Sequence, residues 1–318
     1  MSGKTILVTG GHGFIGSNFI HYYLNKYPDY QIVNIDYNTE AASPENISCP
    51  QQKARYSFYR IDIRNAYAIS HLFERYDITD IIHFAAETRN TDSVGEIRLY
   101  EQTNVLGKLN VLQAAQQAWM TSNNQPKPQY VNSRFHQIAL DDRTMPSLYT
   151  DSKRRADAAV RAFQTSTGLN IVTTVSPEIF GPMQKETGLV PALIQQILNG
   201  ESVSEKRTHS HKHNWLFVRD LCEAIDAVFH LGEPGERYEL ASTARMSNVE
   251  LASILQDYFL GNKLGRTNKK EDPSFFSQKP TSGAQFPGLT PTTSFEKGLR
   301  ITFDWYVTKN KSQAFLNL

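Results

Sequence analysis

Residues 4–16 read KTILVTGGHGFIG, and they are the strongest indication of the fold. The apolar run over residues 5–9 leads into glycines at 10, 13 and 16, and a helical segment follows. In such a unit the first glycine permits the tight turn, the second lets backbone N–H groups approach a pyrophosphate, and the third allows close packing of the helix on the strand. The residues expected to hold the phosphates of a dinucleotide are Gly10, Gly13, Phe14, Ile15 and Gly16.

A second apolar run, QIVNID at residues 31–36, ends in an acid about twenty residues beyond the last glycine of the turn. A carboxylate at this place accepts hydrogen bonds from the ribose hydroxyls of an adenosine and repels a 2′-phosphate. Asp36 therefore predicts NAD rather than NADP as the cofactor. The alternative is a glycine-rich turn in some other α/β fold, and the order of strand, turn, helix and acid disfavours it.

Short β-rich runs alternate with amphipathic stretches in the first half of the chain, which is typical of a parallel sheet covered on both faces. The predicted strands cover residues 5–9, 31–35, 56–60, 81–84, 130–131 and 171–175, and the clearest helices cover residues 99–119 and 152–165. From residue 177 onward prolines interrupt the pattern. We expect an α/β fold with a Rossmann-type doubly wound parallel sheet over residues 1–176. A smaller C-terminal substrate-binding lobe over residues 177–318 is expected to return segments to that sheet.

The composition excludes several classes of protein. The chain has 318 residues, 40% of them hydrophobic, and a net charge of +1, which gives no reason to expect nucleic acid as a partner. Its two cysteines, Cys49 and Cys222, are far apart and predict neither a disulfide framework nor a cysteine zinc site. No apolar run is long enough to span a bilayer, and the first strand leaves no room for a signal peptide. We therefore expect a soluble cytoplasmic protein.

Tyr149 and Lys153 stand four residues apart in YTDSK, and therefore on one face of a helix. A phenol is a weak base at neutral pH, but an adjacent cation favours the phenolate. With Ser133 hydrogen-bonding the reacting oxygen, Tyr149 is expected to remove a hydroxyl proton while hydride passes to the nicotinamide. Tyr22 and Lys26 have the same spacing, but they follow the glycine turn, where a surface or packing role is expected.

Several segments in the same order resemble the extended short-chain dehydrogenases/reductases, and most closely the nucleotide-sugar 4,6-dehydratases of the dTDP-glucose 4,6-dehydratase type. They include ILVTGGHGFIGSNF at 6–19, HFAAET at 83–88, TNVLGKLNVLQAA at 103–115, YTDSK at 149–153 and NWLFVRDLCEAI at 214–225. The resemblance implies bound NAD, a sugar-nucleotide substrate, and a homodimer built partly from the helix near Asn104 and the helix that carries Tyr149. The further cofactor contacts that it implies are Thr39 near the adenosine, Asp62 and Ile63 beside the adenine, and Ala85 and Ala86 along the cofactor.

One segment departs from that family. The family's strand-end sequence STDEVYG supplies a Thr and then an Asp–Glu pair that serves the elimination of water. The predicted strand at 130–131 puts Ser133 at the Thr and Arg134 and Phe135 at the acid pair, and neither of these two side chains exchanges protons near neutral pH. The resemblance then implies transient oxidation at C4 followed by an atypical dehydration. The residues left to replace the pair are Glu87, His136, Asp141, Asp142 and Glu178.

Other functions stay open at this point: a 4-epimerase, a net dehydrogenase acting on a sugar nucleotide or nucleoside, and a noncatalytic NAD-binding scaffold. The family's diphosphate-side segments are altered in this chain, and the expected substrate contacts are Thr88, Arg134, Glu178 and His213. His209, His211 and His213 alternate and would share one face of a strand, where imidazoles can hold a metal. The expected chemistry needs no metal, so a basic loop is the preferred interpretation and no metal is predicted.

Overall fold

A computed structural model describes residues 3–47, 54–88, 94–140, 147–201, 212–263 and 289–316. The chain divides into two compact units. Unit 1 comprises Met1–Ser176 and Ile225–Glu239, and unit 2 comprises Pro177–Ala224 and Leu240–Leu318.

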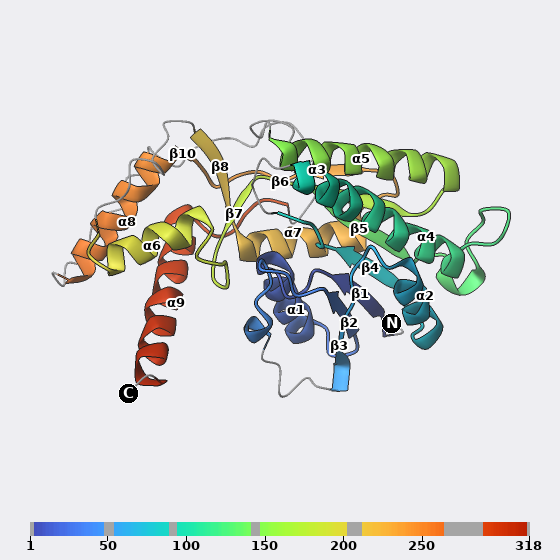
Figure 1. The fold of residues 1–318 in the computed structure, drawn as a ribbon, viewed down its shortest axis with the longest axis horizontal. Coiled ribbons are helices and arrows are strands. Elements are labelled where there is room, and N and C mark those ends of the chain that lie inside the picture. Colours follow the sequence, from blue (N-terminus) through green and yellow to red (C-terminus); the bar gives the residue numbers. More distant parts are fainter. Residues whose placement is uncertain are drawn as a thin grey trace. The chain divides into compact units, whose positions relative to one another are not determined.

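Within the described part of unit 1, a sheet of seven strands runs in the order β3-β2-β1-β4-β5-β6-β9 (Figure 1). Every neighbouring pair is parallel. The strands are β1 (Thr5–Thr9), β2 (Gln31–Asp36), β3 (Tyr56–Arg60), β4 (Asp80–His83), β5 (Arg134–Leu140), β6 (Ile171–Ser176) and β9 (Arg237–Glu239). Because all strands are parallel, their carboxyl ends lie along one edge of the sheet. The predicted Rossmann-type α/β fold is confirmed.

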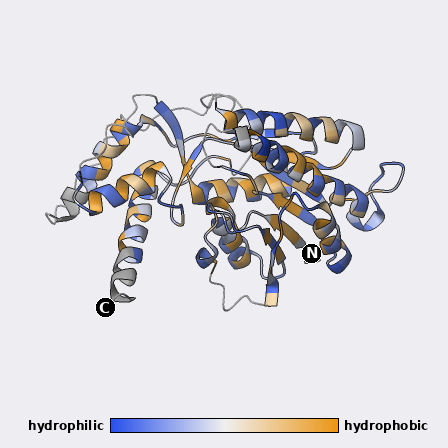
Figure 2. Cartoon of the chain, in the orientation of Figure 1, coloured by the Kyte–Doolittle hydropathy of each residue, from blue (hydrophilic) through white to orange (hydrophobic). Residues whose placement is uncertain are grey.

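The central strands are buried on both faces, which explains their nearly continuous apolar sequences. In β1, Ile6, Leu7 and Val8 are fully buried, and β4 is buried along its whole length. Figure 2 shows the strands of this sheet among the hydrophobic parts of the chain. β-branched and other apolar side chains at these positions pack against helices rather than facing water.

Helices cover both faces of the sheet (Figure 1). On one face α2 (Ala66–Arg75), α4 (Lys108–Trp119) and α5 (Leu148–Thr167) pack side by side. Trp119 is buried in the core beneath them, and its indole N–H donates to the carbonyl oxygen of Ile78 at 2.7 Å. On the other face α1 (Phe14–Lys26) is tied to the second half of α7 (Val218–Leu231) by polar contacts.

The helix predicted over residues 99–119 is one part of a longer helical stretch. It begins with α3 (Val94–Tyr100), continues as the π-helix η3 (Glu101–Gly107) and ends with α4. Such π segments are rare and frequently mark functional sites. In η3, Asn104 is buried and takes part in the contacts described below.

The strand predicted at residues 130–131 is wrong. Residues Pro128–Tyr130 form the short 3₁₀ turn η4, and the N–H of Ser133 donates to the carbonyl oxygen of Tyr130 at 2.9 Å, which closes the turn. The strand follows as RFHQIAL, in which the polar residues His136 and Gln137 are fully buried. A search for an apolar run misses this strand, because two of its interior positions carry polar side chains that find hydrogen-bond partners inside the protein.

Unit 2 contains a small sheet of β7 (Glu178–Phe180), β8 (Lys212–Phe217) and β10 (Ala244–Ser247), in the order β10-β8-β7. The helices of this unit are α6 (Leu189–Leu198), α8 (Asn248–Lys263) and α9 (Phe295–Leu316). Buried aromatic rings of Phe180, Trp215, Phe217 and Phe295 form its core. Among the residues described here, no helix is long and apolar enough to cross a membrane.

Candidate functional site

The turn between β1 and α1 has the geometry of a phosphate-binding loop. Gly10 has φ +71°, and a Cβ there would lie 2.6 Å from the backbone nitrogen of Ala85. A Cβ on Gly16 would lie 2.4 Å from the carbonyl oxygen of Gly10, so both positions need glycine. Gly13 is the N-cap of α1, and no side chain caps this end, so the N–H groups of Phe14, Ile15 and Gly16 form the first turn of a helix whose positive end faces the turn. The turn fits an anion such as a pyrophosphate.

Asp36 lies at the carboxyl end of β2, beside this turn. Its carboxylate accepts the backbone N–H of His12 at 3.0 Å and that of Asn38 at 2.8 Å. The His12 ring contacts Asn38 Oδ1 at 2.7 Å and the Tyr56 hydroxyl at 3.3 Å, and it packs on Phe58. These contacts hold the acid at the edge of the sheet where a ribose next to the bound phosphates would lie.

The other residues that the resemblance implies for the cofactor lie at the ends of neighbouring strands. Asp62 and Ile63 follow β3; Asp62 accepts a bidentate contact from Arg64, and Ile63 is buried against Gly107. Ala85 and Ala86 follow β4, and the Ala85 N–H donates to the Thr9 hydroxyl at 3.2 Å. Thr39 lies three residues beyond β2 and is half-buried. The structure thus brings these residues to the same edge as the glycine turn.

Tyr149 and Lys153 lie in the first turns of α5, which follows β5 and therefore begins near the carboxyl edge of the sheet. Ser147 caps the helix: it accepts the N–H of Thr150, while the Thr150 side chain accepts the N–H of Ser147. This capping box fixes the start of the helix and with it the direction of both side chains. Burial lowers the pKa of Lys153 to about 8, although the charge of Asp157 opposes the shift.

Asn104 connects the helix that carries Tyr149 to the segment after β4. Its Oδ1 accepts the N–H of Glu87 at 2.7 Å, and its Nδ2 donates to the Glu87 carbonyl oxygen at 3.1 Å and to the Ser152 hydroxyl at 2.9 Å. Asn104 was not predicted as a site residue. The sequence offered one indication of it: Asn104 is a polar residue within the apolar pattern of a long predicted helix.

Ser133 does not lie at this edge. It precedes β5, whose first residue, Arg134, pairs with Asp80 at the start of β4. Seven residues of strand, roughly 20 Å, separate it from the end where α5 begins. The prediction that Ser133 acts with Tyr149 is therefore wrong.

Arg134 and Phe135 also lie at the amino end of β5 and do not occupy the positions of an acid pair. The guanidinium of Arg134 donates to the carbonyl oxygens of Val228 and Phe229 at 3.1 and 2.7 Å, and Phe135 is fully buried. Arg134 binds the end of α7 and is not a substrate contact. The prediction that Arg134 and Phe135 replace the acid pair depended on a strand at residues 130–131. It is wrong, because the strand begins only at Arg134.

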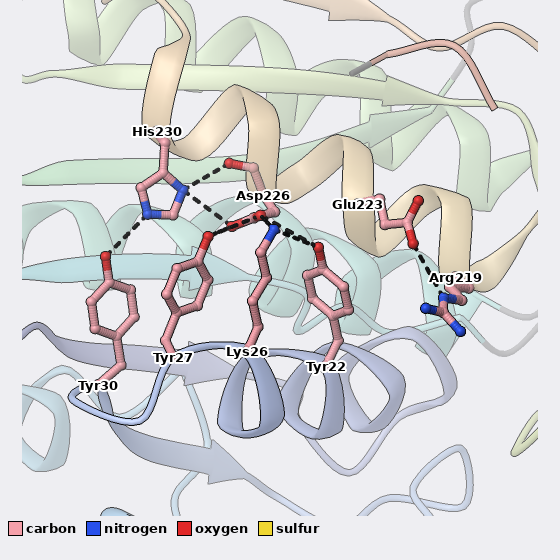
Figure 3. A network of polar contacts seen from close by, with 8 residues as sticks. All are labelled: Tyr22, Lys26, Tyr27, Tyr30, Arg219, Glu223, Asp226 and His230. Carbon is pink, nitrogen blue, oxygen red and sulfur yellow. Dashed lines mark hydrogen bonds and ion pairs between the residues drawn. The ribbon is translucent and has the colours of Figure 1, made fainter. Parts of the chain in front are cut away.

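The second Tyr–Lys pair has the packing role expected of it (Figure 3). Lys26 Nζ donates to the Tyr22 hydroxyl at 2.9 Å and to Asp226 at 2.5 Å. The Tyr27 hydroxyl also donates to Asp226, at 2.8 Å. The pair joins α1 to α7 through this carboxylate.

Of the three other predicted substrate contacts, one belongs to unit 1 and two belong to unit 2. Thr88 follows β4 and is exposed, and its N–H donates to Glu87 Oε1 at 3.1 Å. Glu178 is the exposed first residue of β7, and His213 lies in β8 opposite Met246; both belong to unit 2. His136 is buried in β5 against the Thr174 hydroxyl, which leaves it no role at the edge. Cys49, Asp141, Asp142, His209 and His211 lie outside the described residues, and no metal-binding cluster occurs among those inside them.

A parallel sheet with a glycine-rich phosphate turn after its first strand and a Tyr-x-x-x-Lys pair opening a later helix defines an extended short-chain dehydrogenase/reductase. The model of the GDP-mannose 4,6 dehydratase family matches residues 7–278, and the chain belongs to this family.

Individual relatives agree with this assignment. The chain is 32% identical over 308 residues to the low-salt glycan biosynthesis protein Agl12 of Haloferax volcanii, with 95% of this chain and 98% of the relative covered. It is 28% identical to a dTDP-glucose 4,6-dehydratase of Neisseria meningitidis, with 96% and 93% covered. Among solved structures it is similar to DesIV, a dTDP-glucose 4,6-dehydratase from Streptomyces venezuelae with NAD and TYD bound. The TM-score is 0.78 at 27% identity, with 96% of this chain and 98% of that chain covered.

Proposed function

We propose that this protein is an NAD-dependent dehydratase acting on a sugar nucleotide, which oxidises the C4 hydroxyl transiently and then eliminates water across C5 and C6. The single observation that carries the proposal is the arrangement at the carboxyl edge of the sheet. There the glycine turn, Asp36 and the start of α5, which carries Tyr149, lie at the ends of parallel strands. The named relatives and the NAD reported with DesIV support the same reaction class.

The residues present fit NAD. The uncapped first turn of α1 and the closely packed glycines leave room for a pyrophosphate. Asp36 accepts two N–H groups and keeps further lone pairs for ribose hydroxyls, and its charge opposes a 2′-phosphate. When bound, NAD supplies the acceptor for hydride.

Tyr149 is the base for the sugar hydroxyl in this proposal. Lys153 lies one turn further along the same helix face, and its positive charge favours the phenolate form of Tyr149. The phenolate oxygen takes the hydroxyl proton as the carbon is oxidised. The contact of Asn104 with Ser152 fixes the first turns of α5 against the segment after β4, and so orients this base.

Asp141 and Asp142 are the acid–base pair that we propose for the elimination. In the family the Asp–Glu pair follows this strand, and here β5 ends at Leu140, so that the next two residues in the sequence are both carboxylic acids. A carboxylic acid can protonate the departing hydroxide, and a carboxylate can take the C5 proton. Leu140 itself carries no hydroxyl, so this chain departs from the family at the residue that precedes the pair.

The proposal is tested by incubating the purified protein with dTDP-glucose and a panel of other sugar nucleotides in deuterated water. Elimination incorporates deuterium at C5 or C6 of a 4-keto product, with only transient NADH absorbance. Inversion at C4 without exchange would identify an epimerase instead, and steady accumulation of NADH would identify a net dehydrogenase. The absence of any nicotinamide absorbance change across the panel would contradict an enzymatic role and favour an NAD-binding scaffold.

Two further expectations belong to the same proposal. We propose that the protein is a homodimer, as its resemblance to the dehydratases implies, and that it works in the cytoplasm, which its two widely separated cysteines favour. Analytical ultracentrifugation of the full chain tests the dimer: a monomer at micromolar concentration would contradict it. Fractionation of the source cells tests the location.

A further inference from the structure

The glycine turn carries a buried histidine that the proposed reaction does not use. His12 precedes Gly13 and is only 4% exposed. Its ring packs on Phe58, with the ring centroids 4.2 Å apart. Its Nδ1 lies 2.7 Å from Asn38 Oδ1, and its Nε2 lies 3.3 Å from the Tyr56 hydroxyl. Both ring nitrogens of this side chain therefore have polar partners, which fixes the orientation of the ring.

The ring is one part of a hydrogen-bonded chain that begins in the glycine turn. The Gly11 N–H donates to Asn34 Oδ1 at 3.1 Å, and Asn34 Nδ2 donates to the Tyr56 hydroxyl at 2.9 Å. An amide carbonyl oxygen only accepts hydrogen bonds, so His12 Nδ1 donates to Asn38. In the neutral ring Nε2 then accepts from the Tyr56 hydroxyl. The chain thus reaches from the backbone of the turn to the side chain of Asn38.

Asn38 has a left-handed backbone, which is uncommon for a residue other than glycine. Its φ is +57°, and asparagine adopts this conformation where its short polar side chain finds a local hydrogen bond. The contact with His12 Nδ1 is such a bond. The Asn38 N–H donates to Asp36 Oδ1 at 2.8 Å, while the His12 N–H donates to Oδ2 at 3.0 Å. One backbone donor on each oxygen orients the carboxylate and leaves its other lone pairs for ribose hydroxyls.

We propose that His12 is a positioning residue for the adenosine ribose of NAD: its ring holds Asn38 in the left-handed conformation, and the N–H of Asn38 in turn orients the Asp36 carboxylate. Through Tyr56 and Asn34 the same ring is joined to the turn that receives the pyrophosphate. The ring therefore keeps the phosphate-binding turn and the ribose-binding acid in one fixed arrangement. The inference rests on NAD binding and does not depend on the proposed elimination of water.

The test is a competition between NAD and the NAD analogue that lacks the adenosine 2′ hydroxyl. The full-length protein is equilibrated with both, and native mass spectrometry gives the ratio of the two bound forms. The natural protein should prefer NAD by on the order of tenfold, because the analogue cannot donate this hydroxyl to Asp36. His12→Phe keeps a ring against Phe58 and the backbone N–H to Asp36, but removes both ring nitrogens. It should lose most of the preference for NAD.

The control is His71→Phe, which makes the same substitution at an exposed position on α2 and should leave the preference unchanged. A general weakening of the fold would lower both affinities together and leave their ratio in place. If His12→Phe fails to fold, Asn38→Ala decides the question, because it removes the oxygen that the His12 ring holds and should lower the ratio in the same way.

An unchanged ratio in the folded variant would overturn the inference, and so would a natural protein that shows no preference for NAD. A lowered ratio in a protein that eliminates water from no sugar nucleotide would support the inference and count against the proposed function instead.

Discussion

The backbone nitrogen of Ala85 lies 2.6 Å from the place that a Cβ on Gly10 would occupy. Because Gly10 also has φ +71°, the substitution Gly10→Ala adds a steric clash to a strained backbone. Gly168 provides a matched control, since it has φ +69° and a Cβ added there would meet nothing within 4 Å. We expect Gly168→Ala to lower the free energy of unfolding by about 1 kcal/mol and Gly10→Ala by about 2–4 kcal/mol with loss of NAD binding. Urea unfolding measures the free energy of unfolding, and calorimetry measures NAD binding. Equal losses of stability in the two variants would contradict the close approach of Gly10 to Ala85.

The two Tyr-x-x-x-Lys pairs allow a matched comparison. Lys153→Met should lower the rate of C4 oxidation by on the order of 100-fold or more, because Tyr149 loses the cation that favours its phenolate. Lys26→Met should leave that rate unchanged and lower only the stability, because Lys26 joins α1 to Asp226. Single-turnover NADH absorbance and thermal unfolding separate the two effects. If folded Lys26→Met lost the oxidation step, the assignment of Tyr149 and Lys153 as the reacting pair would be contradicted.

Asp226 should make the stability depend on pH in the acid range. Hydrogen bonds from His230, Lys26 and Tyr27 outweigh burial and lower its pKa from 3.8 to about 2. A carboxylate whose pKa is lower in the folded state stabilises the fold above pH 4, and this contribution is lost as the pH falls from about 4 to about 2. The loss should be about 2 kcal/mol, since the carboxylate is largely buried. Urea unfolding of Asp226→Asn against the natural protein tests this, and parallel pH curves for the two would refute it.

Asp141→Asn and Asp142→Asn should uncouple the two halves of the reaction. Each variant should still reduce bound NAD, because Tyr149 and Lys153 are intact, but should release product at least 10²-fold more slowly. NADH absorbance would then persist where it is transient in the natural protein. Normal dehydration by the double variant would place the acid–base pair elsewhere.

The corresponding control is Arg134→Met. Loss of the guanidinium removes a donor from the carbonyl oxygens of Val228 and Phe229, although the Gly232 N–H still donates to that of Val228, and should cost about 1–3 kcal/mol of stability. The partition between oxidation and elimination should not change, because Arg134 lies at the amino end of β5. A change in that partition would restore the interpretation of Arg134 as a site residue.

The sequence was most informative where local chemistry is decisive. The glycine turn and Asp36 could be predicted because a tight turn, a close approach and an acid at a strand end each require one type of residue. The Tyr149–Lys153 pair could be recognised from its helical spacing, and the structure separates it from Tyr22–Lys26 by its place at the start of α5.

The predictions that were wrong involved buried polar residues. His136 and Gln137 hid β5, and the misplaced strand carried Ser133 and Arg134 to the wrong edge of the sheet. Asn104 and Lys108 are polar residues in a stretch predicted as a helix, and both are buried. Spacing along the chain does not show which polar side chains find partners inside the protein, since those partners come from distant strands and helices.

In the proposed reaction the phenol of Tyr149 takes the proton in the oxidation step. Mixing the natural protein and Tyr149→Phe with a substrate sugar nucleotide, and following the reduction of bound NAD in a single turnover, tests it most directly. Tyr149→Phe should bind NAD and the nucleotide normally and reduce NAD at least 10²-fold more slowly. Reduction at an undiminished rate in Tyr149→Phe would show that this phenol is not the base.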